Sequence, residues 1–324
     1  MIFQRPTYFT GAGRTEKVID IGQCIYCRSS EDLSREHVVP KSLGGDLILR
    51  NATCGVCKGR IGEYEEKLIR SAFQPIRDTR RIKSYSPLRQ KSAVRVRRHG
   101  CIETDSVSVA DHPGDITFPS FPPPGLLVGR DRLEPWPSGF NQTYFRKYDN
   151  KAIRDTGAEK IVLGPEFSLT WFARFIAKVS HGFAVATLGI DGFKPYLLDT
   201  IVQGAPSPTF FIGSLGRRLP SRDGFAHEFS IHPLQIAERM MAVARLRFFQ
   251  DLGKDAKQVG PPHYIAAVGE ITDPRLLRGA RLYTSYADFE FDMVVQFGPE
   301  LAADGKPLLC SGGPVFGTQL TGRA

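Results

Sequence analysis

Four cysteines in the first sixty residues have the spacing of a metal site. They form two Cys-x-x-Cys pairs, Cys24 with Cys27 and Cys54 with Cys57. A gap of two residues lets both thiolates of a pair face one ion, and two such pairs complete a tetrahedral shell around Zn²⁺. Four thiolates leave no coordination position for water, so we expect a structural zinc site. Redox-active motifs and a coincidence of spacing are the alternative interpretations, but redox motifs rarely occur as two matched pairs.

The segment between the two pairs contains a Glu-His dipeptide at Glu36 and His37, then a proline, a Gly-Gly turn and Asn51. The order of these features resembles that of the HNH endonucleases, in which a two-knuckle zinc site holds a ββα-metal fold. The resemblance is carried by CIYCRSSEDLSREHVVPKSLGGDLILRNATCGVCKGRIGEYEEKL. It extends from about Cys24 to Phe73, which is less than a quarter of the chain.

The resemblance implies catalytic roles for three residues. His37 would be the general base that takes a proton from the attacking water, a task that suits imidazole because its ordinary pKa is about 6.5. Glu36 would bind the Mg²⁺ or Mn²⁺ ion that contacts the scissile phosphate, since these ions prefer carboxylate oxygens. Asn51 would orient the base through a hydrogen bond. The implied activity is metal-dependent hydrolysis of phosphodiester bonds.

One position departs from the family pattern. After the second pair the family commonly has Asn or His as a further metal ligand, and this chain has Lys58. A protonated lysine has three donors and no acceptor, so it cannot bind a cation. Glu65, on the face of the following helix that packs toward the strands, is the candidate to complete the catalytic metal site with Glu36. The alternatives for Glu65 are an ion pair with Arg35 or Arg60, or a solvated helix edge.

The charge of the chain is unevenly distributed. The net charge is +9, and residues 1–100 hold 20 Lys and Arg against 10 Asp and Glu, whereas the remainder holds 23 against 24. A basic block beside a neutral one favours a polyanionic partner, because phosphate contacts release counterions. A solvated charged face is the alternative. The candidate nucleic-acid-binding residues are Arg35, Lys41, Lys58, Arg80, Arg81, Arg95 and Arg97.

The predicted fold class is α+β. We expect a zinc-bound ββα-metal module of the HNH type over residues 18–81, made of two short strands and one amphipathic helix. A basic strip and a proline-rich connection follow over residues 82–140, because a proline-dense segment cannot form a central strand or a helix interior. Residues 141–324 are expected to form a larger mixed α/β domain of unknown type.

Several elements are predicted outside the module. Alternation over 93–97 predicts a strand with one charged face. A helix is expected from about 165–168 to Leu188, with Gly189 to end it, and another over 233–252, with a proline in its first turn. Strands are expected over 264–268 and 289–297. We find no motif in this part of the chain that specifies a chemistry, and no function is predicted for the six histidines other than His37.

The sequence also bears on compartment. No N-terminal stretch has the pattern of a secretory signal, so we expect a cytoplasmic protein with no membrane partner. The most apolar stretch, residues 171–190, contains three residues that disfavour membrane insertion, Arg174, Lys178 and His181. We interpret it as a buried helix. Six cysteines are too few for a disulfide scaffold, and Cys101 and Cys310 are expected to be small core residues.

The sequence leaves three functions open. The first is a metal-dependent endonuclease acting on DNA, most simply on the double-stranded form. The second is a zinc-stabilised nucleic-acid-binding protein that is catalytically silent because of Lys58. The third is a nuclease directed at RNA or at a structured junction. Cleavage that depends on His37 would separate the first and third from the second.

Overall fold

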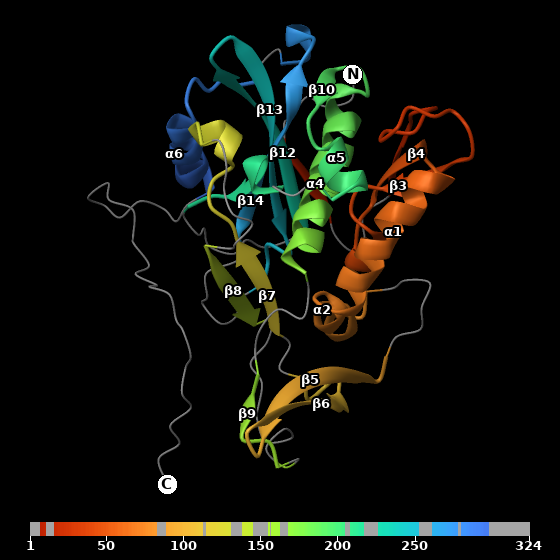
Figure 1. Cartoon of the computed structure of the whole chain (residues 1–324), viewed down its shortest axis with the longest axis vertical. Helices are drawn as coiled ribbons and strands as arrows, with labels where there is room; N and C mark the ends of the chain where they lie inside the picture. The colour runs from red at the N-terminus through yellow and green to blue at the C-terminus, as the bar shows by residue number, and fades with distance from the viewer. Residues whose placement is uncertain are drawn as a thin grey trace.

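The structure is a computed structural model of the whole chain (Figure 1). It describes residues 7–10, 16–82, 89–112, 115–130, 138–144, 155, 157–162, 168–204, 208–216, 226–252, 261–277 and 280–297.

A three-stranded sheet and a long helix form the N-terminal module. Strand β4 (Leu47–Cys54) lies in the middle, antiparallel to β3 (Leu33–His37) and parallel to β2 (Lys17–Asp20). A short 3₁₀ turn, η1 (Lys41–Leu43), connects β3 to β4, and helix α1 (Gly55–Arg70) follows β4 directly. The prediction of two strands and one amphipathic helix is therefore confirmed, with β2 as an additional edge strand. The module ends in α2 (Gln74–Arg80).

Local sequence explains this arrangement. In α1 the buried residues Cys57, Ile61, Tyr64 and Leu68 recur every three or four positions, which places them on one face of the helix. The Gly-Gly turn has a steric cause: Gly44 has φ +90°, and a Cβ on Gly45 would lie 2.0 Å from the Val39 carbonyl oxygen. Only glycine fits both requirements.

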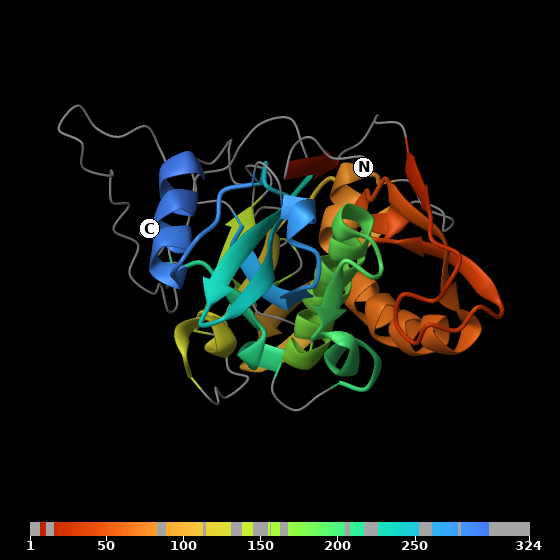
Figure 2. The ribbon, with the colours of Figure 1, turned by 90° about the horizontal axis from the view of Figure 1, so that it is seen from above.

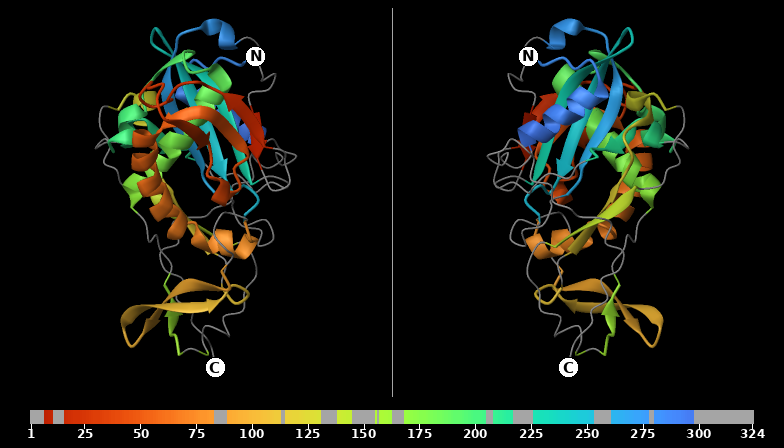
Figure 3. Two further views of the ribbon diagram at one scale, coloured as in Figure 1. Left: turned by 90° about the vertical axis from the view of Figure 1, so that its right-hand side faces the viewer. Right: turned by 90° about the vertical axis from the view of Figure 1, so that its left-hand side faces the viewer.

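A small basic sheet projects from the rest of the chain (Figures 1 and 3). It consists of β5 (Lys91–Arg98) between β6 (Cys101–Ser108) and β9 (Lys160–Ile161). The predicted alternation in β5 is confirmed, because the even-numbered Ser92, Val94 and Val96 are buried and the residues between them are not. The expectation that Cys101 is a core residue is wrong, since it is exposed at the start of an edge strand, and Cys310 lies outside the described residues.

The proline-rich connection contains β7 (Asp115–Ser120) and the 3₁₀ turn η2 (Gly125–Val128). Strand β7 pairs only with β8 (Gly139–Tyr144) within the described residues, so Pro119 lies in a two-stranded ribbon and not within a central strand. This agrees with the restriction that proline places on sheet interiors.

The largest sheet combines strands from distant parts of the chain, and all its strand pairs are antiparallel. Its order is β1 (Thr7–Thr10), β12 (His227–Ile236), β13 (Arg239–Phe248), β14 (His263–Ile271) and β10 (Phe193–Pro195), and β11 (Ile212–Ser214) also pairs with β14. Strand β14 confirms the prediction over residues 264–268. Three shorter elements border the sheet, α5 (Leu198–Val202), η3 (Pro208–Phe210) and η4 (Pro274–Leu277).

Helix α4 (Leu169–Leu188) lies between the module and this sheet (Figure 2). Ser168 caps its first turn and Gly189 follows its last, which confirms the predicted helix. It is buried nearly all round, and one apolar core runs from the module through α4 into the sheet. No helix within the described residues is both long and apolar enough to cross a bilayer.

The predicted helix over residues 233–252 is wrong. The segment forms most of the β12–β13 hairpin, closed by the two residues Ala237 and Glu238. Both faces of β13 are buried, one against α4 and the other against α6, so its apolar run lacks the alternation that would have marked a strand. The turn is also unmarked, because Ala237 adopts φ +51° where Asn or Gly is usual.

The predicted strand over residues 289–297 is also wrong. The segment is helix α6 (Tyr286–Phe297), whose Phe289 and Met293 face the sheet at helical spacing while Phe291 is exposed. Ser285 caps it by accepting a hydrogen bond from the Asp288 main-chain nitrogen, and its hydroxyl donates to the Asp288 carboxylate. This capping pattern favours a helix over the apparent alternation.

Candidate nuclease site

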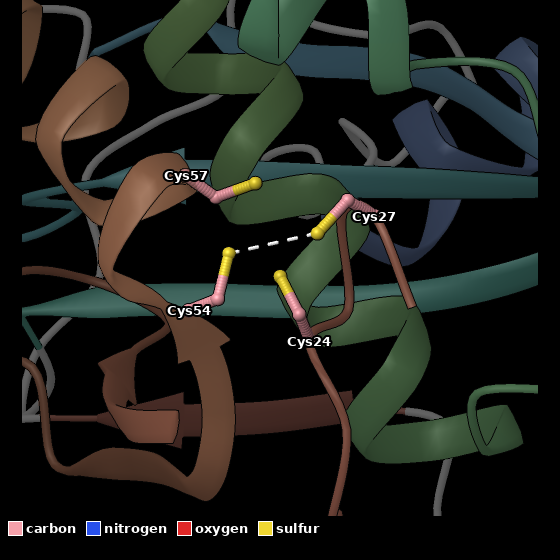
Figure 4. A group of neighbouring side chains, drawn as sticks. All are labelled: Cys24, Cys27, Cys54 and Cys57. Carbon is pink, nitrogen blue, oxygen red and sulfur yellow. Dashed lines mark hydrogen bonds between the residues drawn. The ribbon is translucent and has the colours of Figure 1, made fainter. Parts of the chain in front are cut away.

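The four predicted zinc ligands come together at the start of α1 (Figure 4). Cys24 and Cys27 lie in the loop after β2, Cys54 ends β4, and Cys57 lies in the first turn of α1. All four sulfur atoms lie within 4.8 Å of one another, and those of Cys27 and Cys54 are 3.5 Å apart. Every member except Cys27 is buried.

This cluster fits zinc. Four thiolates at about 2.3 Å from one tetrahedral ion are about 3.8 Å from each other, close to the spacing observed here. The Cys57 main-chain N–H donates to Cys54 at the helix N-terminus and lowers the pKa of the Cys54 thiol to about 7. The cluster would therefore hold a structural Zn²⁺ that ties the loop after β2 to α1.

His37 is placed at the end of β3, opposite Ile48 of β4. Its side chain is half-buried. Burial lowers the pKa of His37, and the nearby positive charge of Lys178 lowers it further. Nδ1 is buried and has no hydrogen-bond partner among the described residues, so only Nε2 can meet a water molecule. The imidazole is therefore a neutral base near pH 7.

Glu36 is held on both sides by other side chains. It is 7% exposed, and its Oε1 lies 2.6 Å from the Lys178 ammonium. Its Oε2 accepts a 2.6 Å hydrogen bond from the Thr53 hydroxyl on the neighbouring strand β4. Neither oxygen of this carboxylate is left without a partner.

Glu65 meets the same lysine from α1. Its Oε1 lies 3.0 Å from the Lys178 nitrogen, and burial raises the pKa of Glu65. Lys178 also donates to the main-chain carbonyl of His37 and contacts that of Val38 at 3.3 Å. Burial alone would lower the pKa of Lys178, but the attraction of the two carboxylates outweighs burial and raises it. The predicted pair of acids does come together, with an ammonium between its members.

The donors of the pair do not fit a catalytic Mg²⁺ or Mn²⁺ in this arrangement. A divalent ion needs carboxylate oxygens that are free to bind it, whereas Glu36 and Glu65 are both ion-paired with Lys178. Lys58, at the position of the usual family ligand, is exposed. The assignment of Glu36 and Glu65 as metal ligands stays a prediction that this geometry does not favour.

The side chain of Asn51 is hydrogen-bonded to Asp20 and not to His37. Its side-chain nitrogen donates 3.0 Å to Asp20 on β2, and its backbone has φ +53°. Asn51 thus braces the β2–β4 edge of the sheet. The hydrogen bond to the base that the resemblance implied is not among its contacts with the described residues.

Two of the predicted nucleic-acid-binding residues are engaged within the chain. Lys41 lies 3.0 Å from Glu16 in an exposed ion pair. Arg80 forms a two-point contact with Asp251, at 3.0 and 2.9 Å, which ties α2 to the turn after β13. Arg80 therefore has a structural role whatever it does toward a ligand.

The other five candidates are distributed over two surfaces. Arg35 and Lys58 are exposed on the module, Arg81 is exposed after α2, and Arg95 and Arg97 lie on the small basic sheet, where Arg97 is exposed and Arg95 is partly so. In that sheet the strand face with Arg95 and Arg97 also carries Lys91 and Lys160, because Arg97 pairs with Lys160 across the strands. We call these four residues the basic face.

Lys178 and Thr53 were not predicted as site residues. One signal for Lys178 exists in the sequence: a charged residue inside a helix that is apolar all round must have a buried partner. The sequence does not say which partner, because the contact joins residues 140 or so positions apart. The contact of Thr53 with Glu36 depends on how β3 pairs with β4, and the sequence does not give the register of that pairing.

A Cys₄ cluster at the junction of a β-hairpin and a helix, with an imidazole at the end of the neighbouring strand, defines an HNH-type ββα-metal module. A comparison with protein families agrees: residues 24–73 match the model of the HNH endonuclease family. No curated protein and no solved structure matches the chain. The module is therefore of the HNH type, and the match does not extend to the rest of the chain.

Proposed function

We propose that this chain is an endonuclease that hydrolyses phosphodiester bonds of DNA, with His37 as the general base. The observation that carries the proposal is the half-buried imidazole at the end of β3, inside the segment that matches the HNH endonuclease family. Because its pKa is lowered, His37 is neutral at pH 7 and can take a proton from water at Nε2.

The polypeptide around His37 limits how this base can move. Its main-chain carbonyl accepts a hydrogen bond from Lys178, and its strand is paired with β4. A fixed main chain limits the positions that the imidazole can take, and a well-placed base needs less ordering when it meets the attacking water. The zinc cluster contributes by fixing β4 and α1 and takes no part in the proton transfer.

The basic face supports a nucleic-acid substrate. Lys91, Arg95, Arg97 and Lys160 share one side of the projecting sheet, and no acidic residue of its three described strands lies on that side. Glu103 is on the opposite side, paired with Arg98. Segregated positive charge of this kind suits the phosphate backbone of duplex DNA, which carries closely spaced negative charges.

A second function is favoured by one observation. Lys178 forms ion pairs with Glu36 and Glu65, the two carboxylates that were predicted to bind a metal. If cleavage requires a divalent ion at these carboxylates, the chain is a catalytically silent nucleic-acid-binding protein stabilised by zinc. An RNA-directed nuclease remains the third candidate, because phosphate contacts do not distinguish the two polymers. The cytoplasmic location stays a prediction.

One experiment separates the three. Wild-type protein and His37→Ala are incubated with duplex DNA, single-stranded DNA and RNA, each with and without Mn²⁺, in buffers freed of trace metal. We expect the wild type to cleave duplex DNA and His37→Ala to bind it without cleavage. Binding without cleavage by both proteins supports the silent binder, and cleavage of RNA alone changes the substrate.

A further inference from the structure

We propose that Lys178 is the built-in cation of this nuclease module: its ammonium occupies the space between Glu36 and Glu65 that a divalent metal would need, and it fixes the main chain of His37. The inference deepens the proposed function and rests on it only in calling the module a nuclease. Lys178 is a positioning residue, because its side chain is 1% exposed and cannot touch a substrate.

The surroundings of the Lys178 nitrogen resemble those of a metal ion. Four oxygens from two segments lie around it: one from Glu36 at 2.6 Å, one from Glu65 at 3.0 Å, and the carbonyl oxygens of His37 and Val38. Carboxylate and carbonyl oxygens are the ligands of hard cations. An ammonium has three protons to donate, so this shell satisfies it fully.

Helix α4, which carries Lys178, is anchored to the module by two further residues. One turn after Lys178, the Nε2 of His181 donates 2.9 Å to the carbonyl of Ile25 in the first zinc knuckle. Gly182 packs next to Val38, and a Cβ there would lie in ordinary van der Waals contact with the valine side chain, at 3.4 Å. Lys178 therefore enters the module on a fixed element whose neighbours on the same face are also in contact with the module.

Charge supports the same conclusion. Two carboxylates and one ammonium leave at most one negative charge in the cluster. A divalent ion entering this space would meet a buried positive charge at the distance of a direct contact. In a buried site the repulsion between the Lys178 ammonium and a divalent ion is weakly screened, so the ion is excluded as long as Lys178 is present.

The function of the carboxylates is then to hold the lysine, and through it the base. Lys178 donates to the carbonyl of His37, the residue whose imidazole acts on water. The acids on β3 and α1 thus fix the main chain next to the base from two sides. Any divalent ion used in catalysis would have to be held by other groups.

The first test measures Mn²⁺ binding by electron paramagnetic resonance on the full chain with its zinc site loaded. Wild type is compared with Glu65→Gln, which keeps the size of the side chain and removes its charge. We expect the two proteins to bind the same number of Mn²⁺ equivalents. One equivalent that is present in the wild type and missing from Glu65→Gln overturns the proposal.

The second test removes the built-in cation. In Lys178→Met the side chain ends one atom earlier and loses its charge, which leaves the two carboxylates unpaired and lowers the melting temperature. We expect Mn²⁺ to raise the melting temperature of Lys178→Met by several degrees more than that of the wild type, and the double variant with Glu65→Gln to lose this gain. An equal response of Lys178→Met and wild type to Mn²⁺ contradicts the proposal.

Lys67→Met is the matched control, because Lys67 forms a comparable 2.8 Å ion pair with Glu63 on the exposed side of α1. Its response to Mn²⁺ should equal that of the wild type. If Lys178→Met does not fold, the comparison of wild type with Glu65→Gln still decides the proposal. Absence of cleavage by the wild type would defeat the proposed function, whereas both Mn²⁺ readouts are independent of cleavage.

Discussion

The Nε2 atom of His181 donates a 2.9 Å hydrogen bond to the main-chain carbonyl of Ile25, inside the first zinc knuckle. A second buried histidine does the same on β12, where His227 Nε2 donates 2.8 Å to the carbonyl of Leu43. Both imidazoles come from the second part of the chain and both acceptors belong to the module. The module is therefore held to the large sheet by two neutral histidines as well as by apolar packing.

These histidines predict acid-sensitive stability. Burial lowers the pKa of each to about 4 from an ordinary 6.5. Above pH 6.5 folded and unfolded states are both neutral at these positions, and between pH 6.5 and 4 only the unfolded state takes up the proton. The free energy of unfolding should fall across this window as the pH falls, by about 1.4 kcal/mol per pH unit for each histidine.

Urea unfolding at a series of pH values checks this prediction with His227→Gln, whose amide can still donate to Leu43. The variant should lose part of the slope between pH 6.5 and 4. A slope identical to that of the wild type would show that His227 does not contribute.

Loss of one zinc ligand should loosen the module. Cys54→Ser removes one of the four thiolates within 4.8 Å of each other, so we expect the bound zinc to fall from one equivalent per chain toward zero. The melting temperature should fall with it. Elemental analysis and thermal unfolding measure both, with the exposed Cys101→Ser as control. Wild-type protein without zinc after purification in zinc-containing medium would rule out the site.

A buried ion pair in the large sheet should be essential for stability. Arg245 Nη2 donates 2.6 Å to Glu228 Oε1, its Nε donates to Ser230, and both charged side chains are completely buried. Arg245→Met leaves the glutamate buried without its counter-charge, which costs about 3–5 kcal/mol. Denaturant unfolding measures this.

The comparison for this variant is Arg275→Ala, because Arg275 forms an exposed ion pair with Asp273. Exposed pairs contribute only about 0–1 kcal/mol. A destabilisation of Arg245→Met no larger than that of Arg275→Ala would mean that the buried pair is replaceable by apolar packing.

The basic face predicts a salt-dependent contribution to DNA binding. In a double variant with Arg95→Ala and Arg97→Ala we expect weaker binding of a short duplex. The plot of log K against log salt should be less steep by about 0.9 for each phosphate that the protein no longer neutralises. Fluorescence anisotropy between about 50 and 200 mM salt measures the slope. Arg275→Ala, on a distant exposed turn, should leave it unchanged. The same slope in the double variant and the wild type would remove the basic face from the interface.

The part of the site that depends on local spacing could be predicted from the sequence. Each of these features depends on a short local pattern: the two Cys-x-x-Cys pairs, the strands around His37 and the periodicity of helix α1. The structure brings the four sulfurs together. The hydrogen-bond partner of Asn51 could not be predicted in this way, because its contact with Asp20 depends on the parallel pairing of β2 with β4.

What could not be predicted depends on long-range contacts. The sequence indicates that Lys178, inside an apolar helix, needs a buried partner, but only the docking of α4 shows that its partners are Glu36 and Glu65. The β12–β13 hairpin is hidden because its strands are covered on both faces and its turn uses Ala237 in a conformation that alanine rarely adopts. Both failures come from tertiary burial overriding local pattern.

The central claim is that His37 is the base of a nuclease, and single-turnover cleavage of a labelled DNA duplex tests it most directly. His37→Ala should retain wild-type zinc content and melting temperature and bind the duplex equally well, while its cleavage rate falls by about 10²–10⁴-fold. Cleavage by His37→Ala at the wild-type rate would contradict the account.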